Sequence, residues 1–168
     1  MTRNYTLFAI GLLLIIGAIS QLPATPNKTG SVIVAKIDSC TLITKAEAEG
    51  LLVEPAKDAE EKDSSYKNNL VSQCRYSSAN PSSIKSVAIR TSQWPTTLAA
   101  KYEFDQPKLS GAEGTDMPGI GDAAIYRSNV KTLFVLKGNV YLMVMLVEIG
   151  SAPESTKALA LKALSRLQ

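Results

Sequence analysis

Cys40 and Cys74 are the residues whose type and spacing point most directly to a chemistry, because the sequence holds only these two cysteines. A bond between them would close a loop of about 35 residues and stabilise a fold by roughly 4 kcal/mol in the chain-entropy model. A redox pair is the alternative, but such pairs usually have the far shorter C-x-x-C spacing. The sequence therefore predicts a structural disulfide between Cys40 and Cys74, in a chain that reaches an oxidising compartment.

Side chains suited to catalysis are few, because the sequence contains no histidine. This excludes Ser-His-Asp triads, imidazole bases and most zinc sites. Ser-x-x-Lys begins at Ser64 and at Ser82, but the Ser-Asp-Asn element of penicillin-binding enzymes is missing, and Lys-Thr-Gly at 28–30 precedes both copies. Asp116 and Asp122 could form an acid–base pair, although acids beside glycines usually brace turns. We therefore expect a non-enzymatic protein, with a hydrolase that uses serine or carboxylate chemistry as the alternative.

A glycine-rich stretch at residues 119–124 reads Gly-Ile-Gly-Asp-Ala-Ala and matches the G-x-G-x-x-A pattern of dinucleotide-binding turns. That chemistry needs a strand before the pattern and a helix after it, so that the pyrophosphate meets a helix N-terminus. Here Met117 and Pro118 precede the pattern, and a predicted strand follows it. The sequence therefore predicts a tight turn that leads into a sheet, and no cofactor.

Charge patterning excludes two further classes of site. The acidic stretch at residues 54–63 is interleaved with lysine and lacks the alternating acids and the turn glycine of a calcium loop, so we expect a solvated loop without a metal. The net charge of +3 is spread along the chain rather than gathered in a basic block. Nucleic-acid binding is therefore not expected.

The centre of the predicted fold is residues 140–148, which read V-Y-L-M-V-M-L-V-E. Both parities of this run are apolar, as in a strand in the middle of a sheet whose two faces are covered. Residues 131–137 form a second apolar run, and Gly138 with Asn139 makes the two-residue connection of a hairpin. The sequence therefore places a β-hairpin at the centre of the fold.

Helices are predicted from caps and apolar spacing. The capping box of Thr44 and Glu47 begins a helix that runs to about residue 52. A second helix is predicted at 96–104, with Leu98, Ala99 and Tyr102 at helical spacing as its apolar face. The remaining predicted elements are strands at 73–77, 85–92 and 124–127, an edge strand within 32–37, and a closing helix from 151 to 167 whose apolar stripe is Ala160, Leu161, Leu164 and Leu167.

These elements define a single domain at residues 32–168. The composition is that of an ordinary globular protein, 45% hydrophobic and 20% charged, and the chain is long enough for one core. The predicted order is α-β-β-α-β-β-β-α with mostly hairpin connections. We therefore expect the α+β class, an antiparallel β-sheet with helices packed against it.

The N-terminus predicts export. Arg3 precedes residues 7–19, an uncharged and mostly apolar run that matches a signal-peptide core of about 7–15 residues and falls short of the roughly 20 needed to span a bilayer. Small residues at positions 18 and 20 predict cleavage before Gln21, which makes 1–20 a signal peptide; an uncleaved membrane anchor is the alternative. Residues 21–31 are rich in Pro, Thr and Asn and are predicted to form a flexible linker. The expected location is extracytoplasmic: the periplasm, the medium, or the outer side of the cytoplasmic membrane.

Several short motifs resemble a family of secreted bacterial envelope proteins of unknown function, common as actinobacterial lipoproteins. They are Asp-Ser-Cys at 38–40, Thr-Lys-Ala-Glu at 44–47, Cys-Arg-Tyr at 74–76 and Pro-Gly-Ile-Gly-Asp-Ala-Ala at 118–124. The resemblance covers about residues 38–167 and implies a location in the cell envelope and a fold, but no catalytic residues. This chain departs from the common form because it lacks a lipobox cysteine, so the resemblance does not imply a lipid anchor.

The expected function is binding of an envelope protein or a small ligand by a non-enzymatic module. Functional contacts favour loops that are held by a rigid scaffold, which singles out the loop at residues 110–122. Asp116, Met117, Ile120 and Asp122 are its candidate contact residues. The alternative is a covering loop whose glycines only permit a tight turn.

Overall fold

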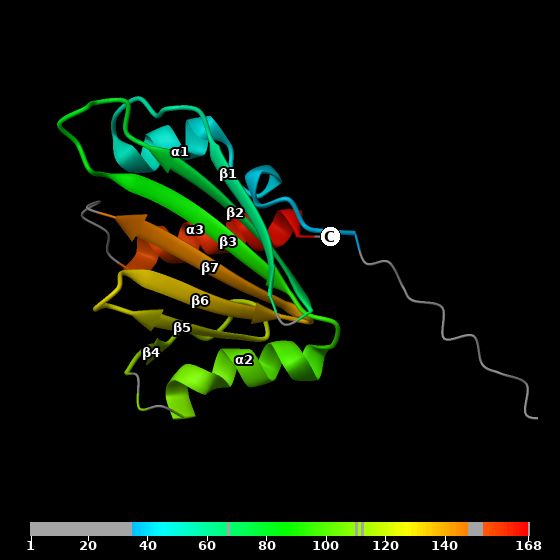
Figure 1. The fold of residues 1–168 in the computed structure, drawn as a ribbon. Helices are drawn as coiled ribbons and strands as arrows, with labels where there is room; N and C mark the ends of the chain where they lie inside the picture. Colours follow the sequence, from blue (N-terminus) through cyan, green and yellow to red (C-terminus); the bar gives the residue numbers. More distant parts are fainter. Residues whose placement is uncertain (1–34, 67, 110, 112, 148–152, 168) are drawn as a thin grey trace, which may run out of the picture. The chain divides into compact units, whose positions relative to one another are not determined.

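Seven strands form one antiparallel sheet within the residues that this computed structural model describes, namely 35–66, 68–109, 111, 113–147 and 153–167. In spatial order the strands are β1 (Glu60–Tyr66), β2 (Asn69–Ser77), β3 (Ser86–Gln93), β7 (Val140–Val147), β6 (Thr132–Lys137), β5 (Ala123–Arg127) and β4 (Thr115–Asp116) (Figure 1). The helical elements are the 3-10 turn η1 (Ser39–Thr41) and the α-helices α1 (Lys45–Leu52), α2 (Thr97–Leu109) and α3 (Pro153–Arg166). The predicted α+β class is confirmed.

The predicted central hairpin is present as β6 and β7. Lys137 pairs with Val140 at its turn, where Gly138 has a φ of 56°, a value that glycine adopts without steric cost. β7 also pairs along its whole length with β3. It therefore occupies the fourth of the seven positions in the sheet, as the sequence predicts.

One face of the sheet is covered over its central strands, and we call it the covered face. Val140, Leu142, Val144 and Leu146 of β7 are buried on this face. They belong to a single core cluster with apolar residues from the neighbouring strands and from three helical elements: Val87, Ile89, Leu133, Val135, Leu42, Ala48, Leu52, Leu159, Ala160 and Ala163. The elements η1, α1 and α3 therefore pack on the covered face.

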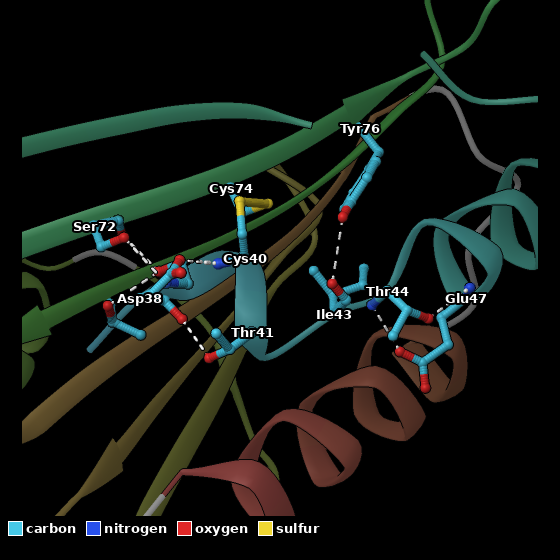
Figure 2. The surroundings of a disulfide bond; sticks show 11 residues. Asp38, Cys40, Thr41, Ile43, Thr44, Glu47, Ser72, Cys74 and Tyr76 are labelled. Atoms are coloured by element: carbon cyan, nitrogen blue, oxygen red, sulfur yellow. Dashed lines mark hydrogen bonds between the residues drawn. A yellow bond between two sulfur atoms is a disulfide. The ribbon is translucent and has the colours of Figure 1, made fainter. Parts of the chain in front are cut away.

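The disulfide between Cys40 and Cys74 is confirmed, with a Cα–Cα distance of 4.9 Å. It joins η1 to β2, which contains the strand predicted at 73–77. The backbone N–H of Cys40 also donates to Asp38 Oδ1 at 2.7 Å, which caps η1 (Figure 2). Ser39, fully buried, donates to the carbonyl of Ser72 at 2.8 Å. Covalent and polar contacts thus fix η1 on the sheet.

The opposite face of the sheet is covered only in part. Helix α2 contributes Ala100 and Phe104 to a second, smaller cluster with Trp94, Ile125, Phe134 and Leu136. On β7 the residues of the second parity are less buried than those of the first: Tyr141, Met143 and Met145 are half-buried, and Val147 is exposed. The expectation that both faces of this strand are covered therefore holds fully for one face only.

Strand β1 was not predicted, because its sequence, EEKDSSY, has no apolar alternation. It forms by pairing its backbone with β2 from Glu60↔Arg75 to Tyr66↔Asn69. The solvated loop expected at 54–63 therefore ends where β1 begins. Charged side chains on an edge strand are a usual defence against pairing with another chain. The edge strand expected within 32–37 is absent from its described part, 35–37, where the backbone is irregular.

The predicted apolar face is wrong for most of α2, where only Ala99 packs on a core cluster, whereas Ala160, Leu164 and Leu167 of α3 pack on the core as predicted. On α2 the core residues are Ala100 and Phe104, whereas Leu98 and Tyr102 are 77% and 64% exposed. Phe104 packs edge-on against Tyr141 of β7, and this contact orients the helix. On α3 the core residues are Thr156, Leu159, Ala160 and Ala163, and Leu161 is exposed.

No helix in the described part of the chain combines the length and apolar character needed to cross a bilayer. The predicted signal peptide or anchor at 1–20 and the linker at 21–31 lie outside the described residues.

Candidate functional site

The four candidate contact residues of the loop at 110–122 occupy unequal positions; Ser110 and Ala112 of this loop lie outside the described residues. Asp116 is exposed, and its Oδ1 lies 3.4 Å from Lys108 Nζ. Met117 is half-buried against the main core, and Ile120 is only 1% exposed. Ile120 is therefore a core residue and cannot contact a partner in this conformation.

Asp122 stabilises the turn of the central hairpin. Its Oδ2 accepts a hydrogen bond from the backbone N–H of Gly138 at 2.6 Å, and its Oδ1 lies 3.2 Å from Lys137 Nζ. These contacts, the Gly138 N–H first, lower the pKa of the Asp122 carboxyl. The turn-bracing interpretation of this acid therefore accounts for its position.

Residues 119–124 form the tight turn that the sequence predicts. Gly121 has a φ of 60°, and a Cβ at this position would lie 2.5 Å from the carbonyl oxygen of Leu136. The backbone N–H of Asp122 donates to the same oxygen at 2.8 Å. β5 follows the turn directly, so no helix N-terminus is present to receive a pyrophosphate.

One cavity, about 480 Å³, adjoins the first half of this loop at Gly111, Glu113, Gly114 and Thr115. Two others adjoin its second half. The larger, about 520 Å³, lies between α2 and the β5–β6 region, and its walls include Leu98, Phe104 and Leu136. The smaller, about 250 Å³, is lined by residues 116–124 and by Lys108. The lysines beside them already have acidic partners: Lys101 pairs with Asp105, Lys108 with Asp116, and Lys137 with Asp122. These two cavities are thus partly apolar spaces whose neighbouring charges are neutralised within the protein.

The catalytic candidates named in the sequence analysis do not converge on one site among the described residues. Lys85, the lysine of the second Ser-x-x-Lys, donates to the carbonyl of Leu52 at 3.2 Å and lies 3.3 Å from Glu54 Oε1. It is therefore held as a paired cation. Lys67, from the first copy, lies outside the described residues. Asp116 and Asp122 each pair with a different lysine.

One group of metal-ligand type, Asp38, Cys40 and Glu61, gathers within 4.8 Å in the described part of the chain. Cys40 is bonded to Cys74, so its sulfur is not a thiolate, and Asp38 accepts from the Cys40 backbone. Asp38 and Cys40 therefore have structural roles, in the cap of η1 and in the disulfide.

Three arginines that the sequence analysis did not select lie on the second face of the sheet: Arg75 on β2, Arg90 on β3 and Arg127 on β5. Arg90 pairs with Met143 of β7, and Met145 follows on the same face of that strand. We call Arg75, Arg90, Arg127, Met143 and Met145 the arginine face.

The arginines of this face have no carboxylate partner among the described residues. Arg75 Nη2 donates to Ser86 Oγ at 3.0 Å, and the Arg127 guanidinium lies over the ring of Phe134, 4.8 Å from its centroid. All three side chains are half-buried, and each Nε is buried without a hydrogen-bond partner. A buried donor without an acceptor costs roughly 1–3 kcal/mol. An anion at this face would therefore meet guanidinium charges that no described carboxylate pairs with, although the Nε atoms themselves are buried.

Tyr141 connects the arginine face to α2. Burial raises the pKa of its hydroxyl to about 12, so the group stays protonated at neutral pH. The charges of Arg127 and Arg90 oppose this rise, and that of Glu103 on α2 adds to it. The charges of Arg127, Arg90 and Glu103 therefore all influence the pKa of the Tyr141 hydroxyl.

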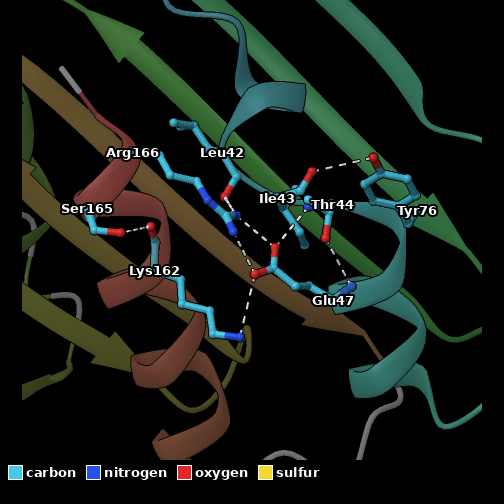
Figure 3. A network of polar contacts seen from close by, with 8 residues as sticks. All are labelled: Leu42, Ile43, Thr44, Glu47, Tyr76, Lys162, Ser165 and Arg166. Atoms are coloured by element: carbon cyan, nitrogen blue, oxygen red, sulfur yellow. Dashed lines mark hydrogen bonds and ion pairs between the residues drawn. The ribbon is translucent and has the colours of Figure 1, made fainter.

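A different arginine shows what a structural pair looks like in this protein. Arg166 of α3 donates from Nη1 to Glu47 Oε2 at 2.7 Å and from Nη2 to Glu47 Oε1 at 2.8 Å (Figure 3). Its Nη1 also donates to the carbonyl of Leu42 at 3.0 Å. Glu47 completes the predicted capping box with Thr44. This network fastens α3 to α1.

The sequence carries a partial signal for the arginine face. Each arginine alternates with residues buried on the covered face, for example Arg75 between Cys74 and Tyr76, and Arg90 after Ile89. Alternation places them on the outer face of their strands. Whether the three arginines lie near one another depends on the order of the strands in the sheet, which the sequence does not reveal.

Comparison with known proteins returns no matching family model and no significantly similar curated protein. The resemblance to secreted envelope proteins therefore stays a prediction.

Proposed function

We propose that this chain is an exported, non-enzymatic binding protein of the cell envelope and that it binds its partner through the arginine face. One observation carries the proposal: Arg75, Arg90 and Arg127 are half-buried on a partly open sheet face without a carboxylate partner in the described residues. Charges retained without a partner cost stability, and such sites are commonly functional. The loop at 110–122 supports this less well, because Ile120 and Asp122 are used by the fold.

Export is supported by the predicted signal peptide and by the disulfide. A disulfide is compatible with an extracytoplasmic location, where such bonds persist. The intact mass of the protein recovered from the periplasm or medium should begin at Gln21. A full-length product in the membrane fraction would instead support the anchor, with the domain tethered by residues 21–31.

Binding is tested by capture from an envelope fraction with the wild-type chain and two charge-matched variants. Arg90→Gln/Arg127→Gln should lose the captured species, because both charges lie on the arginine face. Lys57→Gln/Lys157→Gln removes two positive charges elsewhere and should retain it. If Asp116→Ala or Met117→Ser abolishes capture while the arginine variant does not, the loop is the binding surface.

The hydrolase alternative is separated by assays with ester, glycoside and peptide substrates. We expect no turnover, because Lys85, Asp116 and Asp122, the candidate groups from the sequence, are each held in an ion pair. Turnover that is lost in Ser82→Ala or Asp122→Ala would contradict the proposal.

A further inference from the structure

The arginine face is long compared with a single small anion. Arg75 of β2 lies opposite Ala88 of β3, which lies opposite Met145 of β7. Met145 lies opposite Thr132 of β6, which lies opposite Arg127 of β5. Neighbouring strands are about 4.8 Å apart, so the four steps from β2 to β5 separate these two backbones by about 19 Å. Arg90 lies between them, one row along. One carboxylate or phosphate can contact only one end, so a ligand that uses the whole face needs anionic groups at both ends.

The guanidinium groups of Arg127 and Arg75 are held by contacts within the protein. Arg127 lies over Phe134, whose ring stacks on Tyr141 with centroids 6.0 Å apart and an interplanar angle of 20°. Tyr141 in turn packs against Phe104 of α2. Arg75 is fixed at the other end by Ser86. A planar, pre-oriented guanidinium binds carboxylates through two parallel hydrogen bonds and loses little side-chain entropy when it does so.

The middle of the face is apolar. Met143 and Met145 of the central strand lie half-buried between the arginines, and their neighbours Ala88 and Thr132 are small. Arginine, methionine and aromatic residues are enriched in protein–protein interfaces. The strands beneath are paired on both sides. Contact is therefore made by side chains rather than by addition of a strand.

The face is a surface rather than an enclosed pocket. Four cavities in the described part of the chain are lined by residues other than the three arginines. Small ligands usually bind in concave pockets that bury most of their surface. The half-buried methionines do not protrude as the apolar anchors of a membrane-bound surface do. The shape thus favours a segment of a macromolecule.

We infer that the arginine face binds an acidic segment of a protein partner, with carboxylates at both ends and apolar side chains between them. One end contacts Arg75 and Arg90, the other contacts Arg127, and the apolar side chains lie on Met143 and Met145. This inference rests on the proposed function and specifies its partner. An extended segment of about six residues spans the required 19 Å, at roughly 3.3 Å per residue.

Two described carboxylates near this face leave the site available. Glu60 of β1 is the register partner of Arg75, but it is exposed and forms no ion pair with it. Glu103 of α2 influences Tyr141 without an ion pair to Arg90 or Arg127. A partner's carboxylates therefore do not displace an internal salt bridge.

The test uses a synthetic peptide, Glu-Glu-Leu-Ala-Leu-Ala-Glu-Glu, and a control peptide with glutamine at every glutamate. Each is titrated into the full chain labelled with ¹⁵N at arginine, and the Nε–Hε signals are followed by NMR. The acidic peptide should shift the signals of Arg75, Arg90 and Arg127, and the control peptide should not. Its affinity should fall by about ten-fold or more in Arg90→Gln/Arg127→Gln, as expected for lost charge-assisted hydrogen bonds, and stay unchanged in Lys57→Gln/Lys157→Gln.

Reversal of the charges on both the protein and the peptide distinguishes lost binding from lost folding. Arg90→Glu/Arg127→Glu should lose the acidic peptide and bind a version with lysine at every glutamate. A charge-reversed variant that keeps the wild-type melting temperature but binds neither or both peptides would overturn the inference.

Titrations with the control peptide, inorganic phosphate and lipid vesicles distinguish an acidic segment from other ligands of this face. The inference is overturned if the control peptide binds as tightly as the acidic one, or if no peptide shifts the arginine signals. It is also overturned if inorganic phosphate alone binds as tightly, which indicates a small-anion site, or if phosphatidylglycerol vesicles bind more tightly than the peptide, which indicates a membrane surface. In each case, loss of the captured species in Arg90→Gln/Arg127→Gln would still support the proposed function, so the two failures are distinguishable.

Discussion

Arginines on the two faces of the sheet differ in whether a carboxylate pairs with them. On the covered face, Arg166 makes two hydrogen bonds to Glu47 and one to the carbonyl of Leu42, and it joins two helices. On the arginine face, Arg90 and Arg127 are half-buried with no carboxylate partner in the described part of the chain. A buried charge with a partner is explained by the fold, whereas a buried charge without one costs stability. The comparison therefore directs the search for function to the arginine face.

Strand β7 shows the same contrast within a single element. Val140, Leu142, Val144 and Leu146 are buried on the covered face, whereas the residues between them are half-buried or exposed. Stability should therefore depend on the first set and binding on the second. The following predictions test that division, beginning with the largest expected effect.

Removal of the disulfide should cost the most stability. In Cys40→Ser/Cys74→Ser, the free energy of unfolding should fall by about 4 kcal/mol, because the unfolded chain regains the entropy of a loop of about 35 residues. Urea denaturation measures this change. A reducing agent should lower the stability of the wild type similarly and leave the variant unaffected. A loss below about 1 kcal/mol would show that η1 is held by its other contacts.

Truncation of β7 side chains should separate the two faces directly. Leu142→Ala should lower the free energy of unfolding by about 3 kcal/mol, because Leu142 is fully buried and its loss leaves a cavity. Met145→Ala should cost about 1 kcal/mol, because that side chain is already partly in water. Thermal and urea unfolding of both variants provide the measurement. Equal losses would mean that the arginine face is as much a part of the core as the covered face.

Glu47→Gln should cost about 2 kcal/mol at pH 7, because its charged hydrogen bonds to Arg166 are weakened. The hydrogen bonds from Arg166, and next the backbone of Thr44, lower the pKa of the Glu47 carboxyl far below its usual range. A carboxyl whose pKa is lowered by folding stabilises the native state above its unfolded pKa, about 4.3, and this contribution is lost as the pH falls below that value. The stability difference between wild type and variant, measured by urea denaturation from pH 7 to pH 2, should therefore shrink as the pH decreases. A constant difference would contradict the role of this charge.

Arg90→Gln should cause the smallest loss of stability, at most about 0.5 kcal/mol, because no described carboxylate loses a partner and a buried Nε without an acceptor is removed. Binding at the arginine face should nevertheless weaken. Thermal unfolding and the peptide titration, performed on the same sample, compare the two properties. A large loss of stability would assign Arg90 to the fold and remove the contrast between the faces.

The sequence predicts caps and turns correctly because the interactions that form them join residues close together in the chain. The capping box of Thr44 and Glu47 satisfies backbone groups within one turn of α1. The two-residue connection at Gly138 fixes the register of the central hairpin. The turn at 119–124 depends on the positive φ of Gly121. The two cysteines leave one intramolecular pairing, and their wide spacing favours a structural bond over a redox pair.

Properties that depend on distant contacts were decided only by the tertiary structure. β1 has no apolar pattern and exists because β2 offers its backbone as a partner. α2 exposes Leu98 and Tyr102 because Phe104 packs on Tyr141, a residue far along the chain. Alternation placed Arg90 on the outer face of its strand, but strand order and register bring it beside Met143 and into one surface with Arg75 and Arg127. The sequence determined the elements and their local geometry, whereas the candidate site arises from the pairing of strands that are remote in sequence.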